Sequence, residues 1–114
     1  MAVLTKDDIL KASDCSVEPL DVPEWGGRIY LRLWSAADLD AFEKSVLGNQ
    51  QHDDNKRAIV ASLSICDADG NRLFSPEDVE ELGKKSATAL DRVLLRAVEM
   101  NRMTVAAQEE LEKN

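Results

Sequence analysis

The segment 67–78 constrains the fold of this chain most, because its residues fit two incompatible structures. Its sequence is DADGNRLFSPED, and it lies between an apolar stretch and an amphipathic one. In one interpretation it is a calcium-binding loop between two helices. In the other, residues 69–71 form a tight turn and a helix begins after it. Ser75 is then the N-cap, Pro76 the first helical residue and Asp78 the acidic partner of a capping box.

The calcium interpretation depends on side-chain oxygens at the spacing of EF-hand ligands. Positions one, three, five, nine and twelve of that pattern are filled by Asp67, Asp69, Asn71, Ser75 and Asp78. However, Arg72 stands where the loop needs glycine, and Asp78 is shorter than the usual bidentate Glu. Single EF-hands are uncommon, and the chain has no second loop. We therefore favour the turn and helix cap, expect neither metal nor cofactor, and keep a divergent calcium-binding module as the alternative.

The composition limits the partners and the location of the chain. At 114 residues we expect a single domain, 1–114, and its net charge of -8 opposes binding to nucleic acid or to an anionic membrane. The N-terminus lacks a signal peptide, and no apolar run approaches the length of a membrane span, so we expect a cytoplasmic protein. Cys15 and Cys66 are isolated, and we interpret both as reduced thiols. The sequence leaves a disulfide between them open, because it does not give their separation.

Both ends of the chain predict short helices. Thr5 and Asp8 have the spacing of a capping box, which predicts a helix over 6–12 with Ile9 and Leu10 turned inward. Thr104 is a candidate N-cap for a last, acidic helix over 105–113.

Residues 17–34 predict a β-hairpin near the N-terminus. Apolar and polar residues alternate over 17–22 and again over 28–34, and the intervening sequence PEWGG is typical of a turn. Pro19 cannot donate a ladder hydrogen bond, so the first strand is expected at the sheet edge. In the second strand, the alternation places three apolar residues on the core face: Ile29, Leu31 and Leu33. It places the residues that alternate with them on the opposite face: Arg28, Tyr30, Arg32 and Trp34.

Helical periodicity dominates the rest of the chain. Ser35 and Asp38 form a second capping box, ahead of a helix that ends near Gly48. Apolar spacing then predicts a helix running through Ile59 to Cys66, a short helix over 76–82 and a longer one over 87–103. The sequence therefore predicts an α+β fold, with an N-terminal β-hairpin packed on a bundle of about five short helices.

The residues give little support for catalysis. His52, the only histidine, lies in a polar loop with no nucleophile pattern near it. The carboxylates of 77–81 and 109–112 are typical of solvated helix faces. We therefore expect that the chain is not an enzyme.

Aromatic and methionine residues indicate a binding surface instead. Trp25 lies at the hairpin turn, and Tyr30 and Trp34 share a strand face with arginines, a composition that interfaces favour. The alternative is that a later helix covers these rings. Met100 and Met103 offer an adaptable apolar surface at the end of the long helix, although methionines also fill gaps in cores. These five residues are the candidate partner-binding residues.

Four short motifs in consistent order resemble the tail assembly chaperones of long-tailed, siphovirus-like phages and prophages. They are VPEWGG at 22–27, LDAFE at 39–43, CDADGNRLF at 66–74 and KSA at 85–87. The resemblance covers roughly residues 17 to 104, and its motifs are structural.

The resemblance implies a non-enzymatic protein that binds the tape measure protein in the bacterial host cytoplasm. There it keeps a long, apolar, helical chain soluble while tail tube subunits polymerise around it. It also implies a homo-oligomer, and in such families a longer form made by translational frameshifting recruits the tail tube protein. From the residues alone, the calcium-binding module is the alternative, followed by an acidic regulatory or toxin-neutralising protein.

Overall fold

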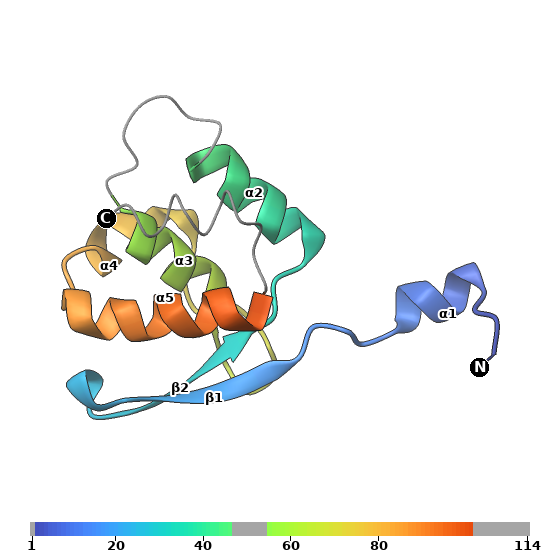
Figure 1. The fold of residues 1–114 in the computed structure, drawn as a ribbon, viewed down its shortest axis with the longest axis horizontal. Helices are drawn as coiled ribbons and strands as arrows, with labels where there is room; N and C mark the ends of the chain where they lie inside the picture. The colour runs from blue at the N-terminus through green and yellow to red at the C-terminus, as the bar shows by residue number, and fades with distance from the viewer. Residues whose placement is uncertain (1, 47–54, 102–114) are drawn as a thin grey trace.

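Helices pack on one face of a three-stranded antiparallel sheet, and one short helix lies apart from this body (Figure 1). The computed structural model describes residues 2–46 and 55–101. The predicted α+β fold is confirmed, with the hairpin at the N-terminal side and every described helix except the first after it. No helix within these two ranges has the length and apolar character needed to cross a bilayer.

The hairpin forms as the alternation predicts. Strands β1 (Val17–Val22) and β2 (Gly27–Arg32) pair from Val17 opposite Arg32 to Val22 opposite Gly27. A 3-10 turn, η1 (Pro23–Trp25), joins them, and Gly26 follows it with a φ of 74°, a left-handed conformation that favours glycine. The strand order β1-β2-β3 places β1 at the edge, as Pro19 predicts.

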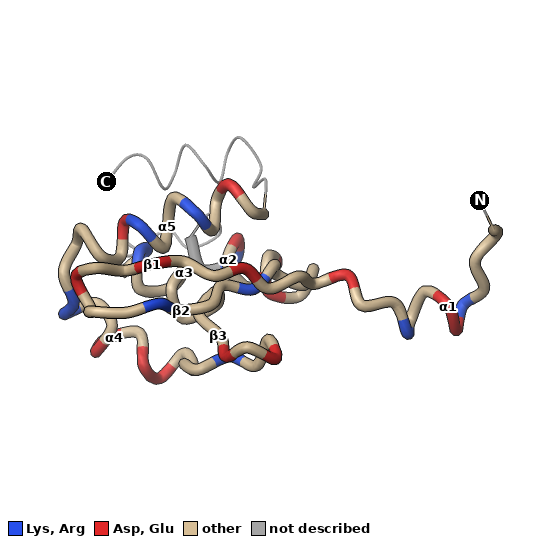
Figure 2. Tube along the Cα trace, turned by 90° about the horizontal axis from the view of Figure 1, so that it is seen from below, with Lys and Arg blue, Asp and Glu red and all other residues tan. Residues whose placement is uncertain are grey.

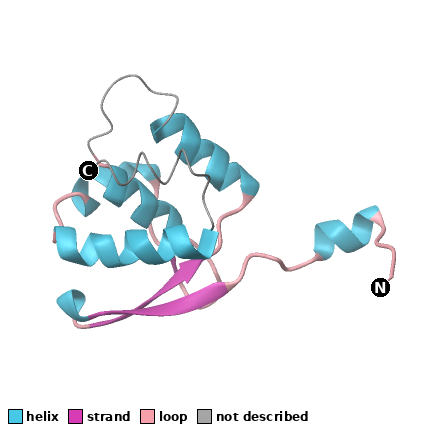
Figure 3. Cartoon of the chain, in the orientation of Figure 1, coloured by secondary structure: helices cyan, strands magenta, loops and turns pink. Residues whose placement is uncertain are grey.

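A third strand, β3 (Ile65–Cys66), lies where the sequence predicts the end of a helix. Helix α3 (Lys56–Ser64) stops at Ser64, and the next residue pairs with Leu31 of β2. Residues 60–66 are all buried, so the apolar pattern carries no period that separates helix from strand. The predicted continuation of the helix to Cys66 is therefore wrong (Figure 3).

The remaining helices follow their local signals. Helix α2 (Ala36–Val46) begins after Ser35, whose Oγ accepts a hydrogen bond from the Asp38 N–H at 3.1 Å. Helix α4 (Val79–Leu82) is short and follows a 3-10 turn, η2 (Pro76–Asp78), and helix α5 extends over Ala87–Asn101. The predicted helix over 105–113, Met103, His52 and the helix end near Gly48 lie outside the described residues.

Two apolar clusters form the core, and α3 and α5 contribute to both. One cluster lies beneath α2 and contains Trp34, Phe42, Val60, Leu63, Leu94 and Ala97. The other lies against the sheet and contains Leu31, Ala58, Ala61, Ile65, Leu82, Leu90 and Val93. Ion pairs from α5 to the hairpin, Arg96 with Glu18 and Arg92 with Glu24, join the helix to β1 and η1.

Helix α1 (Lys6–Lys11) does not face inward, contrary to the prediction. Thr5 and Asp8 do form the predicted capping box. Yet α1 has no buried residue and extends beyond the end of the sheet (Figures 1 and 2). Ile9 is 58% exposed and Leu10 72%, so the expectation that they turn inward is wrong. Periodicity identifies an apolar face but cannot tell whether the body provides a surface to cover it.

Candidate functional site

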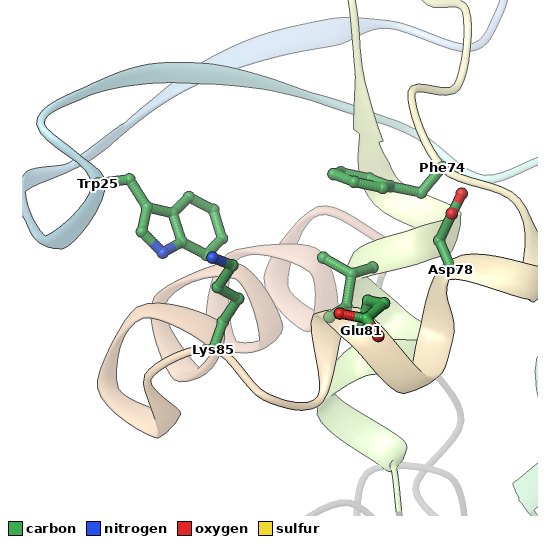
Figure 4. Close-up of a pocket in the computed structure, with 6 residues that line it drawn as sticks. Trp25, Phe74, Asp78, Glu81 and Lys85 are labelled. Atoms are coloured by element: carbon green, nitrogen blue, oxygen red, sulfur yellow. The ribbon is translucent and has the colours of Figure 1, made fainter.

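An open apolar pocket of about 460 Å³, which we call the tip groove, lies between the hairpin tip and α4 (Figure 4). Its residues come from the hairpin tip and from the segment 74–85, and they are Trp25, Phe74, Asp78, Glu81, Leu82 and Lys85. Trp25 and Phe74 face the hollow from opposite sides, and the Lys85 side chain extends toward the indole (Figure 4).

The hairpin tip is held in place by α5. The Glu24 carboxylate accepts hydrogen bonds from Nε of Arg92 at 2.8 and 2.9 Å. Its own backbone N–H and the Arg92 side chain lower the pKa of Glu24, so it stays ionised at neutral pH. Because Trp25 follows Glu24 directly, this contact fixes the half-buried indole at one wall of the tip groove.

The turn over 67–71 lies shortly before Phe74, the first residue of the opposite wall. Gly70 has a φ of 89°, and the Asp67 N–H donates to the Asn71 carbonyl at 2.9 Å. Oδ1 of Asp67 accepts from the backbone N–H groups of Asn71 and Asp69, both at 2.9 Å. These hydrogen bonds, with that of Asn71 first, lower the pKa of Asp67. The tight turn that the sequence predicts is confirmed.

The helix cap that follows is confirmed too, although its first turn is 3-10. Ser75 and Asp78 form a capping box, with the Ser75 N–H donating to the Asp78 carboxylate at 2.8 Å. Asp67 and Asp78, the first and last ligands of the calcium interpretation, thus accept hydrogen bonds from their own turns. Among the residues that the structure describes, no three His, Cys, Asp or Glu side chains are placed to hold a metal ion.

Trp34 is a core residue, so its assignment to an exposed aromatic face is wrong. The ring is 7% exposed, and its centroid lies 5.3 Å from that of Phe42. Strand β2 ends at Arg32, two residues before Trp34, so the alternation no longer determines where this side chain points. Arg32 also turns inward and donates from Nε to the Leu63 carbonyl at 3.0 Å.

The other candidate partner-binding residues are dispersed. Trp25 lies in the tip groove, whereas Tyr30 is 37% exposed on the face of the sheet away from the helices. Met100 is half-buried and packs against the core cluster beside the sheet. Met103 lies outside the described residues, so the structure brings only Trp25 to the groove.

Sequence reasoning missed Phe74, Leu82 and Lys85 as site residues. Phe74 directly precedes the Ser75 cap, and Leu82 is 5% exposed at the end of α4. Their local patterns indicate a turn and a core position, and only the long-range fold brings them to Trp25. A large aromatic just before a helix cap was the one available signal, because such a residue often packs against the following helix.

The comparisons agree with this fold. No protein-family model matches the sequence, and no curated protein matches it. Among solved structures, the tail assembly chaperone of bacteriophage HK97 superposes with a TM-score of 0.60 at 20% sequence identity. The match covers 75% of this chain and 85% of that one. The chain therefore shares its fold with a tail assembly chaperone, a protein of the family that its sequence motifs resemble.

Proposed function

We propose that this chain is a tail assembly chaperone of a long-tailed phage or prophage. The observation that carries the proposal is the fold shared with the HK97 tail assembly chaperone over three-quarters of the chain. Four short sequence motifs, at 22–27, 39–43, 66–74 and 85–87, indicate the same family. At 20% identity the overall sequence similarity is low, so motifs and fold provide largely separate support.

The client in this proposal is the tape measure protein, kept soluble in the cytoplasm of the bacterial host while the tail tube assembles. The tip groove suits such a client, because an amphipathic helix binds by inserting apolar side chains into a groove. Its apolar part is formed by Trp25, Phe74 and Leu82, and charged side chains of both signs surround it. The net charge of -8 favours encounter with basic segments of the client.

The proposed role is non-enzymatic and depends on assembly. We propose a homo-oligomer, together with a frameshifted longer form that brings the tail tube protein to the complex. This chain then supplies client binding, and the longer form supplies contact with the tube.

Co-expression with the tape measure protein of the same phage tests the role. We expect the client to move from the pellet to the soluble fraction and to co-purify with the chaperone. A Trp25→Ala variant should reduce both effects, whereas Leu95→Ala, at a 70% exposed leucine of α5 outside the tip groove, should not. A tape measure protein that stays insoluble and unbound in the presence of the folded wild-type chain would refute the proposal.

A further inference from the structure

The N-terminal arm, residues 2–16, displays apolar surface that the described body leaves uncovered. Among the residues that the structure describes, seven large hydrophobic residues are exposed, and the arm holds four of them: Val3 at 95%, Leu4 at 61%, Ile9 at 58% and Leu10 at 72%. Soluble monomers seldom gather exposed apolar residues in this way, and such groups mark interaction sites.

The arm contains a short helix with a complete capping box. The Thr5 N–H donates to the Asp8 carboxylate at 2.9 Å, and the Asp8 N–H donates to the Thr5 hydroxyl at 3.2 Å. Leu4 precedes the N-cap and Ile9 is the fourth helical residue, the two positions of a hydrophobic staple. A helix of six residues is marginal in water without tertiary contacts, so a surface that covers its apolar residues would stabilise it.

The tip groove of the same chain is at the limit of the arm's reach. Figures 1 and 2 show α1 and the hairpin tip at opposite ends of β1. Strand β1 has six residues, which span about 20 Å. The five linker residues, 12–16, extend to at most about 18 Å and would also have to reverse direction. The tip groove of another copy carries no such constraint.

We propose that the arm of one copy docks in the tip groove of a second copy. Leu10 and Ile9 enter between Trp25, Phe74 and Leu82, the apolar part of the groove. Lys6 lies one helical turn before Leu10 on the same face, which brings its ammonium to the Asp78 and Glu81 carboxylates at the rim. The contact joins different surfaces of the two copies, so it is head-to-tail and continues into a ring or a filament.

This inference deepens the proposed function, because arm and client then compete for one groove, but its test needs no client. Disulfide cross-linking between two differently substituted copies tests which copy the arm reaches. Both partners carry Cys15→Ser, which removes the exposed thiol, while Cys66 is 2% exposed and burial raises the pKa of its thiol. One partner carries Leu10→Cys and the other Lys85→Cys. We expect a disulfide-linked pair containing one of each. In the matched control, the second partner carries Leu95→Cys instead of Lys85→Cys. We expect no cross-link to that partner.

Two results would overturn the proposal. One is equal cross-linking to position 95 and position 85. The other is a chain carrying both Leu10→Cys and Lys85→Cys that closes only on itself, as a monomer, at every protein concentration. That result would assign the groove to its own arm.

Sedimentation provides a second measurement on chains without added cysteines. We expect Leu10→Lys to weaken self-association at least tenfold, with an unchanged circular dichroism spectrum because the residue touches no core. Unchanged self-association would place the interface elsewhere, such as the β1 edge, and would also overturn the proposal. If the arm docks as proposed but the chain does not bind the tape measure protein, only the proposed function is refuted.

Discussion

The indole N–H of Trp34 donates to the hydroxyl oxygen of Ser64 across a distance of 2.9 Å. Ser64 is fully buried at the last position of α3, and Trp34 follows the end of β2. The bond therefore links the junction between α3 and β3 to the end of β2, the strand with which β3 pairs. This contact makes Trp34 part of the framework that positions the sheet under the helices.

Replacing Trp34 should reduce stability. Trp34→Phe keeps an aromatic ring beside Phe42 but removes the donor, and we expect a loss of about 1 to 3 kcal/mol in the free energy of unfolding. Trp34→Ala also leaves a cavity and should cost about 3 to 5 kcal/mol. Urea denaturation measures both. Tyr30→Phe, at a partly exposed residue, should change stability by less than about 0.5 kcal/mol. A loss as small for Trp34→Phe would contradict the framework role.

The sequence predicts those features that depend on neighbouring residues. Capping boxes at Thr5, Ser35 and Ser75 form as expected, because each depends on two groups three residues apart. The hairpin is also local, and so is the turn at Gly70. Such short-range signals determine where elements begin and end.

Features that depend on distant residues were not predictable in this way. Strand β3 exists because Ile65 reaches Leu31, and the inward position of Trp34 depends on α2 and α3. The sequence identified Trp25 as a binding candidate, but Phe74 and Leu82 join it only through the tertiary fold. Likewise, the apolar face of α1 is visible in the sequence, whereas its lack of cover is visible only in the structure.

The ion pair between Arg32 and Asp38 should contribute far more than a surface pair. Its atoms lie 2.6 Å apart, and the two side chains are only 14% and 15% exposed. Asp38 also accepts the Ser35 N–H at the start of α2. We expect Asp38→Ala to cost about 2 to 4 kcal/mol, because it leaves the Arg32 guanidinium partly buried without its carboxylate. Thermal or urea unfolding provides the measurement.

Asp21 offers a matched control for that experiment. Its pair with Arg28 has a similar distance, 2.7 Å, but the side chains are 61% and 71% exposed. Asp21→Ala should cost at most about 1 kcal/mol. Equal losses for the two variants would show that burial does not strengthen the contribution of Asp38.

Ser75→Ala should destabilise the chain by about 1 kcal/mol through the lost helix cap, and calcium should not alter this loss. The reason is that the Asp67 and Asp78 carboxylates already accept hydrogen bonds within their own turns. Calorimetric titration with millimolar calcium should show no saturable heat and no shift in melting. A micromolar dissociation constant that disappears in Asp67→Ala would instead support the calcium-binding module.

Acidification should reveal the contribution of Asp67 to stability. Backbone N–H groups lower the pKa of Asp67 in the folded chain, so its contribution is fully present above the unfolded-state value of about 3.9. It is lost as the pH falls through the lower folded-state pKa. Asp67→Asn should therefore be less stable than wild type at pH 7, and the two should converge in strong acid. Urea unfolding across a pH series tests this, and parallel curves would contradict it.

Trp25→Ala should weaken capture of the tape measure protein by about 1 to 3 kcal/mol, because buried tryptophans dominate the energetics of the interfaces that contain them. Trp25 is only half-buried in the free chain, so part of its ring remains available to a partner. The Glu24–Arg92 contact holds the hairpin tip without the indole, and the variant should therefore stay folded. Titration calorimetry with a soluble tape measure fragment measures the affinity.

Leu95→Ala is the control for that loss. Leu95 lies on α5 outside the tip groove, and its exposed fraction is similar to that of the arm residues, so the variant removes exposed apolar surface without changing the groove. Its affinity should match that of wild type. Both variants lower the exposed apolar area. A loss of affinity in Trp25→Ala but not in Leu95→Ala would therefore assign client binding to the tip groove. If Trp25→Ala stays folded and binds as tightly as wild type, the client binds elsewhere. The smaller hollow at the end of α5, of about 180 Å³ and lined in part by Leu33, Leu39 and Asn101, would then be the next site to mutate.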